Sequence, residues 1–120
     1  MTSAASILVA EDEFLIAMQV EAILTQAGWN VIGPAGTLPE AVKLARSAAC
    51  EAAVLDVNLR GERIDEVANI LAGRGIPFLF TTGYSQEDLP ARYRGSAVII
   101  AKPISAQELV QAVRDLLPKP

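Results

Sequence analysis

The sequence contains no histidine, and Cys50 is its only cysteine among 120 residues. The absence of histidine excludes Ser-His-Asp and Cys-His catalysis and acid–base chemistry by an imidazole. A single cysteine excludes an intrachain disulfide and a zinc site made of several thiolates. Because these two residue types supply most protein ligands of transition metals, most sites for such metals are excluded as well.

The chain also lacks long apolar runs and clusters of basic residues. Its apolar runs, such as 97–101 (AVIIA), are too short to cross a bilayer, and the opening MTSAAS has no feature of a secretory signal. Ten basic and 14 acidic residues give a net charge of -4, which argues against binding to nucleic acid or anionic membranes. These absences predict a cytoplasmic protein with no nucleic-acid partner and no membrane partner.

The length and the 52% content of hydrophobic residues predict one domain over residues 1–120, with no output domain. Short apolar segments alternate with segments in which apolar residues recur every three or four positions. This alternation predicts an α/β fold, a flavodoxin-like (βα)5 doubly wound five-stranded parallel sheet with strand order 2-1-3-4-5. The predicted strands are 6–10, 30–33, 52–55, 77–81 and 97–101, and the helical patterns cover 16–27, 38–45, 64–71 and 109–117.

The fourth connection does not follow the helical pattern. Residues 85–95 (SQEDLPARYRG) have few apolar positions at helical spacing, and Pro90 lies in their middle. A proline inside a helix costs about 3 kcal/mol or more, because it removes a hydrogen bond and clashes with the preceding turn. We therefore expect an irregular fourth helix that is short, broken or mobile.

Polar residues follow the predicted strands at the point where each one ends. Glu11 and Asp12 follow the first strand, Asp56 the third, Thr82 the fourth and Lys102 the fifth. In an open parallel sheet the carboxyl ends of the strands meet at one edge, where ligands bind. We expect the three carboxylates to converge there, with the hydroxyl and the ammonium group on the far side of the same pocket.

Three clustered carboxylates and one lysine do not balance in charge. Two carboxylates about 4 Å apart repel by roughly 4 kcal/mol at an effective dielectric constant of about 20. Either a carboxylate takes up a proton or a cation binds, and an all-oxygen ligand set favours Mg²⁺. A divalent cation beside a carboxylate, a hydroxyl and an ammonium group is suited to phosphoryl transfer, with an aspartate as the nucleophile.

These motifs resemble those of the receiver domains of two-component response regulators, and the resemblance covers essentially the whole chain. Each motif alone is a weak signal, whereas the four in this order at four strand ends are a strong one. They are the acidic pair Glu11-Asp12, Asp56 at the end of AAVLD, Thr82 at the end of PFLFTT, and Lys102-Pro103.

The resemblance implies that Asp56 is the phosphoacceptor of a phosphoprotein that carries an aspartyl phosphate. It further implies that Asp12, Asp56 and the backbone carbonyl of Asn58 bind Mg²⁺, with Glu11 assisting through a water molecule. Thr82 would contact the phosphoryl group together with the lysine that closes the fifth strand.

The resemblance also implies a cis peptide between Lys102 and Pro103. Ile99 departs from the family pattern, because receivers usually carry Tyr or Phe there as the switch residue. PFLFTTGY is similar to the signature of an atypical subgroup, Phe-Ala-Thr-Gly followed by Tyr, so Tyr84 is either a switch or a loop aromatic. We expect residues 83–95, held by few buried contacts, to become ordered on phosphorylation, as the Thr82 hydroxyl is drawn inward.

The resemblance implies a stand-alone response regulator in a phosphorelay, a monomer or weak dimer that signals through protein contacts. Its phosphoryl donor would be a sensor histidine kinase or a phosphotransfer protein. It would not be an enzyme, beyond promoting its own phosphorylation and dephosphorylation. Alternatives are a phosphorylation-independent interaction module and a phosphatase, although Asn58 stands where a phosphatase commonly has a second acid.

Several of these residues also have simpler interpretations. Asp12 could be the N-cap of the first helix, and Thr82 could satisfy backbone groups of its loop. Glu13 is expected to be a solvated residue of the first helical turn, where it favours the helix dipole. Arg60 and Arg63 are expected to be solvated surface residues.

Overall fold

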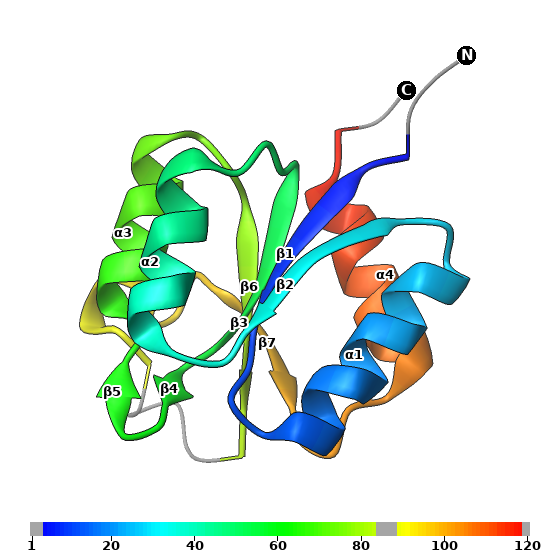
Figure 1. Ribbon diagram of the computed structural model, residues 1–120, viewed down its shortest axis with the longest axis horizontal. Helices are drawn as coiled ribbons and strands as arrows, with labels where there is room; N and C mark the ends of the chain where they lie inside the picture. Colours follow the sequence, from blue (N-terminus) through cyan, green and yellow to red (C-terminus); the bar gives the residue numbers. More distant parts are fainter. Residues whose placement is uncertain (1–3, 84–88, 119–120) are drawn as a thin grey trace.

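The computed structural model describes residues 4–83 and 89–118 of the chain. Its main sheet is parallel and five-stranded, with the order β2-β1-β3-β6-β7, which confirms the predicted topology (Figure 1). Short, apolar strands of this kind are buried on both faces by crossover helices. The five strands are β1 (Ser6–Ala10), β2 (Asn30–Ala35), β3 (Ala52–Asp56), β6 (Phe78–Thr82) and β7 (Val98–Ala101).

Four α-helices cover the sheet in pairs. Helices α1 (Phe14–Gln26) and α4 (Ala106–Leu116) lie on one face, and α2 (Leu38–Ser47) and α3 (Asp65–Gly73) lie on the other (Figure 1). Within residues 4–83 and 89–118, no helix is long and apolar enough to span a membrane.

Strand β3 is the centre of the sheet and separates two apolar clusters. All five of its residues are buried. Ala53 and Leu55 belong to the cluster that packs against α2 and α3, whereas Ala52 and Val54 belong to the cluster that packs against α1 and α4. The site residues at the ends of β1 and β3 are therefore attached to the closely packed interior of the molecule.

Strand β2 is two residues longer than the sequence pattern predicts, because it continues through Pro34 and Ala35. Strand β2 lies at the edge of the sheet, where a proline removes no ladder hydrogen bond that a neighbour needs. The pairing slips between Leu8 and Ala10, so β2 has one extra residue there. Gly33 has φ +99°, and a Cβ atom on it would lie 2.8 Å from the Val9 carbonyl oxygen, so this position requires glycine.

A two-stranded antiparallel hairpin, β4 (Asn58–Leu59) and β5 (Glu62–Arg63), follows β3 directly (Figure 1). The sequence pattern does not predict this hairpin, because two-residue strands carry no measurable periodicity. Leu59 and the following Ile64 are fully buried, which fixes the base of the hairpin to the core.

In the described part of the fourth connection, residues 89–97, the chain forms a 3-10 turn, η2 (Ala91–Tyr93), and no α-helix, which confirms the irregular element predicted from Pro90. The expectation that few buried contacts hold this segment was wrong for its described part. Leu89 is fully buried, and the Tyr93 ring packs edge-on against Phe78 at a centroid distance of 5.3 Å. Tyr84 and the rest of 84–88 lie outside the described residues.

Candidate functional site

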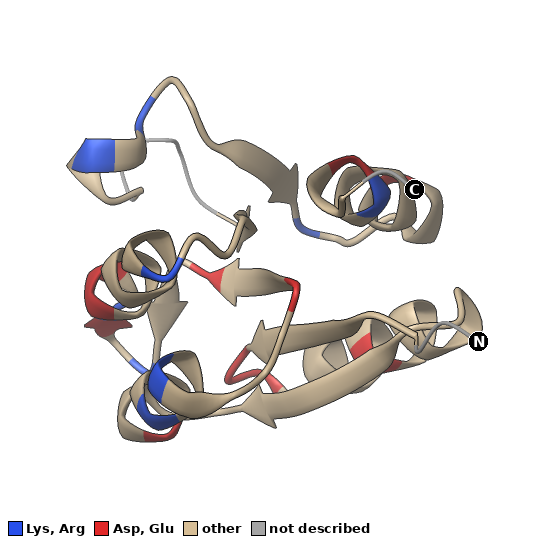
Figure 2. Cartoon of the chain, turned by 90° about the horizontal axis from the view of Figure 1, so that it is seen from above, with Lys and Arg blue, Asp and Glu red and all other residues tan. Residues whose placement is uncertain are grey.

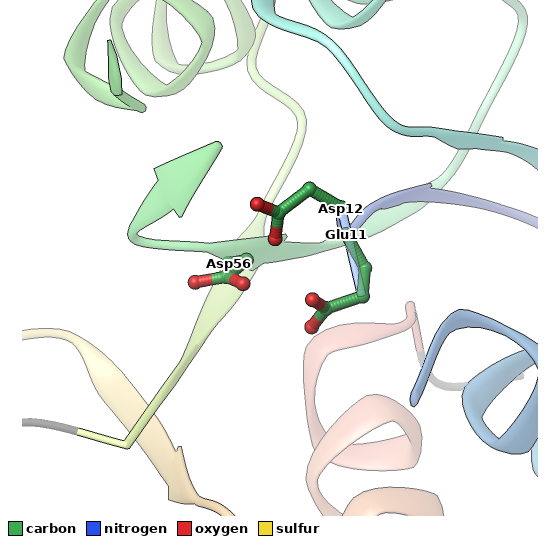
Figure 3. Close-up of side chains that lie close together, drawn as sticks. All are labelled: Glu11, Asp12 and Asp56. Atoms are coloured by element: carbon green, nitrogen blue, oxygen red, sulfur yellow. The ribbon is translucent and has the colours of Figure 1, made fainter. Parts of the chain in front are cut away.

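The three predicted carboxylates converge at the carboxyl edge of the sheet (Figure 3). Glu11 and Asp12 follow β1, and Asp56 ends the neighbouring β3. One carboxylate oxygen of each residue lies within 4.8 Å of the others. Glu11 is only 4% exposed and Asp56 only 5%, so these two acidic groups are largely removed from water.

Lys102, directly after β7, supplies the positive charge of the site. Its Nζ atom lies 2.9 Å from Asp56 Oδ2 and 3.0 Å from Glu11 Oε1. Burial alone lowers the pKa of Lys102, but the hydrogen bonds that its ammonium group donates to these two carboxylates outweigh burial, and the pKa of Lys102 is raised above its usual value. Lys102 is therefore a permanent cation at neutral pH. Figure 2 colours the chain by charge. Red acidic segments lie at the ends of strands in the middle of the sheet, and a blue basic segment directly follows the tip of another strand.

Glu13, expected from the sequence to be a solvated residue of the first helical turn, also contacts the site. Its Oε1 atom lies 3.3 Å from Lys102 Nζ, although 63% of its side chain is exposed. Its position directly after Glu11 and Asp12 was the only signal in the sequence. Lys102 thus contacts carboxylates that follow two different strands.

Glu11 is the carboxylate least suited to carry its charge. The pKa of Glu11 is raised to about 7. Burial is the main cause and the nearby Asp56 adds to it, whereas hydrogen bonds donated by the backbone N–H of Glu13 and by Lys102 act in the opposite direction. Near neutral pH, without a bound cation, Glu11 can therefore hold a proton. This was one of the two ways in which the acidic pocket was expected to balance its charge.

Backbone amides of the β4–β5 hairpin hold the two aspartates. The N–H of Asn58 donates to Asp56 Oδ1 at 3.1 Å, and the N–H of Arg60 donates to Asp12 Oδ2 at 2.8 Å.

The interpretation of Asp12 as the N-cap of α1 was wrong. Glu13 occupies the N-cap position of α1 and makes no side-chain capping hydrogen bond.

A cavity of about 260 Å³ opens beside these groups, lined by Asp12, Glu13, Asp56, Asn58, Gly83 and Lys102. Thr82 is buried at the end of β6, directly before the lining residue Gly83.

The Lys102–Pro103 peptide is cis, as predicted. Ile99 is half-buried and pairs with Phe80 in the sheet, and the aromatic ring that packs on Phe80 from outside the sheet belongs to Tyr93.

The chain matches the family model of the response regulator receiver domain over residues 7–114. It therefore belongs to that family, which places it in two-component signalling. It is 36% identical over 110 residues to the transcriptional regulatory protein PdtaR of Mycobacterium tuberculosis, a match that covers 89% of this chain and 54% of that protein.

The phyllosphere-induced regulator PhyR of Methylorubrum extorquens is 35% identical over 117 residues, which are 95% of this chain and 44% of PhyR. The chain thus spans about half the length of the curated relatives it matches. The solution structure of SdrG from Sphingomonas melonis Fr1 has a TM-score of 0.84 at 37% identity and covers 97% of this chain and 98% of that chain. The BeF3-activated conformation of SdrG, from Pseudomonas melonis Fr1, has a TM-score of 0.76 at 36% identity, with coverage of 98% and 100%.

Proposed function

We propose that this chain accepts a phosphoryl group on Asp56 and signals through phosphorylation-dependent contacts with other proteins. The observation that supports this function best is the convergence of Asp12, Asp56 and Lys102 on one cavity, with Glu11 behind them. Family membership supports the same function. The donor is a sensor histidine kinase or a phosphotransfer protein, and the chain promotes its own phosphorylation and dephosphorylation without being an enzyme for another substrate.

The donor set of the site fits Mg²⁺. It consists of oxygen atoms only, from Glu11, Asp12 and Asp56, within 4.8 Å of one another. Mg²⁺ prefers one or two carboxylates together with waters and phosphate oxygens, and nitrogen or sulfur ligands would favour other metals. We propose that these residues and the backbone carbonyl of Asn58 hold Mg²⁺, which supplies positive charge to the phosphoryl oxygens.

Besides Mg²⁺, the transfer needs a nucleophile and a positive charge from this chain, which Asp56 and Lys102 supply. A carboxylate oxygen of Asp56 attacks the phosphorus of a phosphohistidine, an O–P bond forms, and the N–P bond breaks with its electron pair left on the imidazole nitrogen. The Lys102 ammonium, 2.9 Å from Asp56 Oδ2, stabilises the negative charge that arrives there. The Thr82 hydroxyl is proposed to contact the phosphoryl group after the transfer.

Helix α1 supports delivery of that group by a protein. Phe14, Leu15 and Met18, which we call the α1 patch, are 73%, 78% and 51% exposed, although the opposite side of α1 packs against the sheet. Apolar side chains gathered on a surface are typical of an interaction site. Because α1 begins two residues after Asp12, a partner that brings a phosphohistidine to Asp56 would cover this patch.

The described conformation is proposed to be that of the unphosphorylated protein. Its TM-score to SdrG is 0.84, against 0.76 to the BeF3-activated conformation of SdrG.

The ordering of residues 83–95 on phosphorylation stays a prediction. Hydrogen exchange with and without a phosphoryl mimic would test it, and equal protection in both states would contradict it.

Intact-mass measurement after incubation with Mg²⁺ and acetyl phosphate tests the proposed function. The wild-type chain should gain one phosphoryl group, and chelation of the metal should prevent the gain. Asp56→Asn should stay unmodified, whereas Asp65→Asn, a change at a solvent-accessible aspartate outside the site, should be phosphorylated like wild type. A phosphoryl group on Asp56→Asn would refute the assignment, and a wild-type chain that is never modified would favour the phosphorylation-independent module.

A further inference from the structure

The β4–β5 hairpin contacts both aspartates of the site through backbone amides that are two residues apart. The Asn58 N–H donates to Asp56 and the Arg60 N–H donates to Asp12, at 3.1 and 2.8 Å. Asp12 follows β1 and Asp56 ends β3, so their carboxylates are not placed by one strand alone. The hairpin is the element that fixes one oxygen of each carboxylate relative to the other.

The turn of this hairpin has a backbone that needs support. Arg60 has φ +53° and Gly61 has φ +84°, as a two-residue type I′ turn requires. Glycine adopts this region readily, but an arginine does so at a cost. Support comes from Asn58, whose Oδ1 atom accepts a hydrogen bond from the Gly61 N–H at 2.7 Å. Without this hydrogen bond the turn would be less well ordered, and the Arg60 N–H would be held less firmly toward Asp12.

We infer that the Asn58 side chain is a positioning residue that closes the turn, keeps the Arg60 N–H on Asp12, and so pre-organises the two aspartates for a divalent cation. The inference rests on the proposed function, because the arrangement matters only if a cation binds. It differs from the role that the family resemblance implies for Asn58, which uses the backbone carbonyl. A side-chain substitution leaves that carbonyl in place.

The base of the hairpin is anchored independently of Asn58. Leu59 and Ile64 are fully buried, and the Ile64 N–H donates to the Val57 carbonyl oxygen at 3.2 Å. Loss of the Asn58 side chain should therefore loosen the turn without detaching the hairpin. This makes the inference testable in a folded protein.

The test is a titration with Mg²⁺ alone, followed by amide chemical shifts, on wild type and Asn58→Ala. Loss of a side chain that orients a metal ligand typically weakens metal binding by about 10- to 100-fold, and we expect the lower end of that range. The Arg60 and Gly61 amides should also exchange faster in Asn58→Ala. Asn58→Asp keeps an acceptor oxygen and should keep the Gly61 amide protected. Arg46→Met, a change in α2 outside the site, should bind Mg²⁺ as wild type does.

The outcomes separate the two proposals. If wild type binds Mg²⁺ and Asn58→Ala binds it equally well, the positioning role is refuted and the proposed function stands. If wild type shows no saturable response, the proposed function fails in its metal requirement, and the pre-organising role fails with it. Unchanged exchange of both amides in Asn58→Ala would likewise refute the positioning role, whatever the metal affinity.

Discussion

Replacing Lys102 by methionine removes the positive charge of the site while keeping a side chain of similar length. The lysine Nζ contacts Asp56 at 2.9 Å, Glu11 at 3.0 Å and Glu13 at 3.3 Å. Its side chain is 12% exposed, and those of Asp56 and Glu11 are 7% and 3% exposed. The substitution therefore leaves two buried carboxylates without the cation that balances them.

Removing one partner of a buried ion pair typically costs about 3–5 kcal/mol, because the remaining charge stays desolvated. Glu11 reduces this cost, since burial raises its pKa to about 7 and it can take up a proton. We expect Lys102→Met to lower the free energy of unfolding by about 3 kcal/mol at pH 8 without Mg²⁺. At pH 6 the loss should be smaller, because a protonated Glu11 no longer needs a cation.

Urea unfolding followed by circular dichroism measures this difference at both pH values, with and without Mg²⁺. A cation that binds only the folded state stabilises it by about 1.4 kcal/mol at ten times its dissociation constant. Lys102→Met should gain more from Mg²⁺ than wild type gains at the same concentration, because its site is more negative.

The matched control is Arg46→Met, which breaks the exposed contact of Arg46 with Glu66 at 3.5 Å. Exposed pairs contribute about 0–1 kcal/mol, so this variant should unfold close to wild type. If Lys102→Met at pH 8 loses no more stability than Arg46→Met, then Lys102 does not balance the buried carboxylates. A loss that is equal at pH 6 and pH 8 would instead refute the part assigned to Glu11.

Three further predictions concern other parts of the chain. Gly33→Ala should lower the free energy of unfolding by about 3 kcal/mol, because its Cβ would lie 2.7 and 2.8 Å from backbone atoms. Gly36→Ala should cost little, and equal urea midpoints for the two variants would contradict this. Tyr93→Ala should destabilise more than Tyr93→Phe, since only the former removes the ring contacts; equal losses would refute that packing. Leu15→Glu should slow phosphorylation by a phosphotransfer protein but not by acetyl phosphate, and equal rates for both donors would argue against docking at the α1 patch.

The sheet and the main site residues could be predicted because both follow from the apolar pattern of the strands and from the shared edge at which parallel strands end. A short apolar run such as AAVLD forms a strand buried on both faces, and parallel strands end at one edge. Asp12, Asp56 and Lys102 were therefore placed together by the order of the strands alone. No knowledge of side-chain conformation was needed for that step.

The remaining features depend on contacts between residues distant in sequence. Glu13 joins the site because Lys102, 89 positions later, reaches it. Tyr93 is held by Phe78 and by a hydrogen bond from its hydroxyl to Asn69 at 2.9 Å, although the pattern around Pro90 indicates only a broken helix. Periodicity describes which face of an element is apolar, and it carries no information on which partner a short irregular segment finds.

The charge distribution of the site links its stability to its proposed function. Glu11, Asp12, Glu13 and Asp56 surround the site, and Lys102 is the cation that contacts three of them. The site therefore carries an excess of negative charge, which protonation of Glu11 or binding of a cation reduces. A phosphoryl group on Asp56 would add negative charge next to the same ammonium group, so it would compete with Glu11 and Glu13 for Lys102. Glu11 precedes α1 and Glu13 is its N-cap residue, so a change in the contacts of Lys102 would alter the start of the helix that carries the α1 patch.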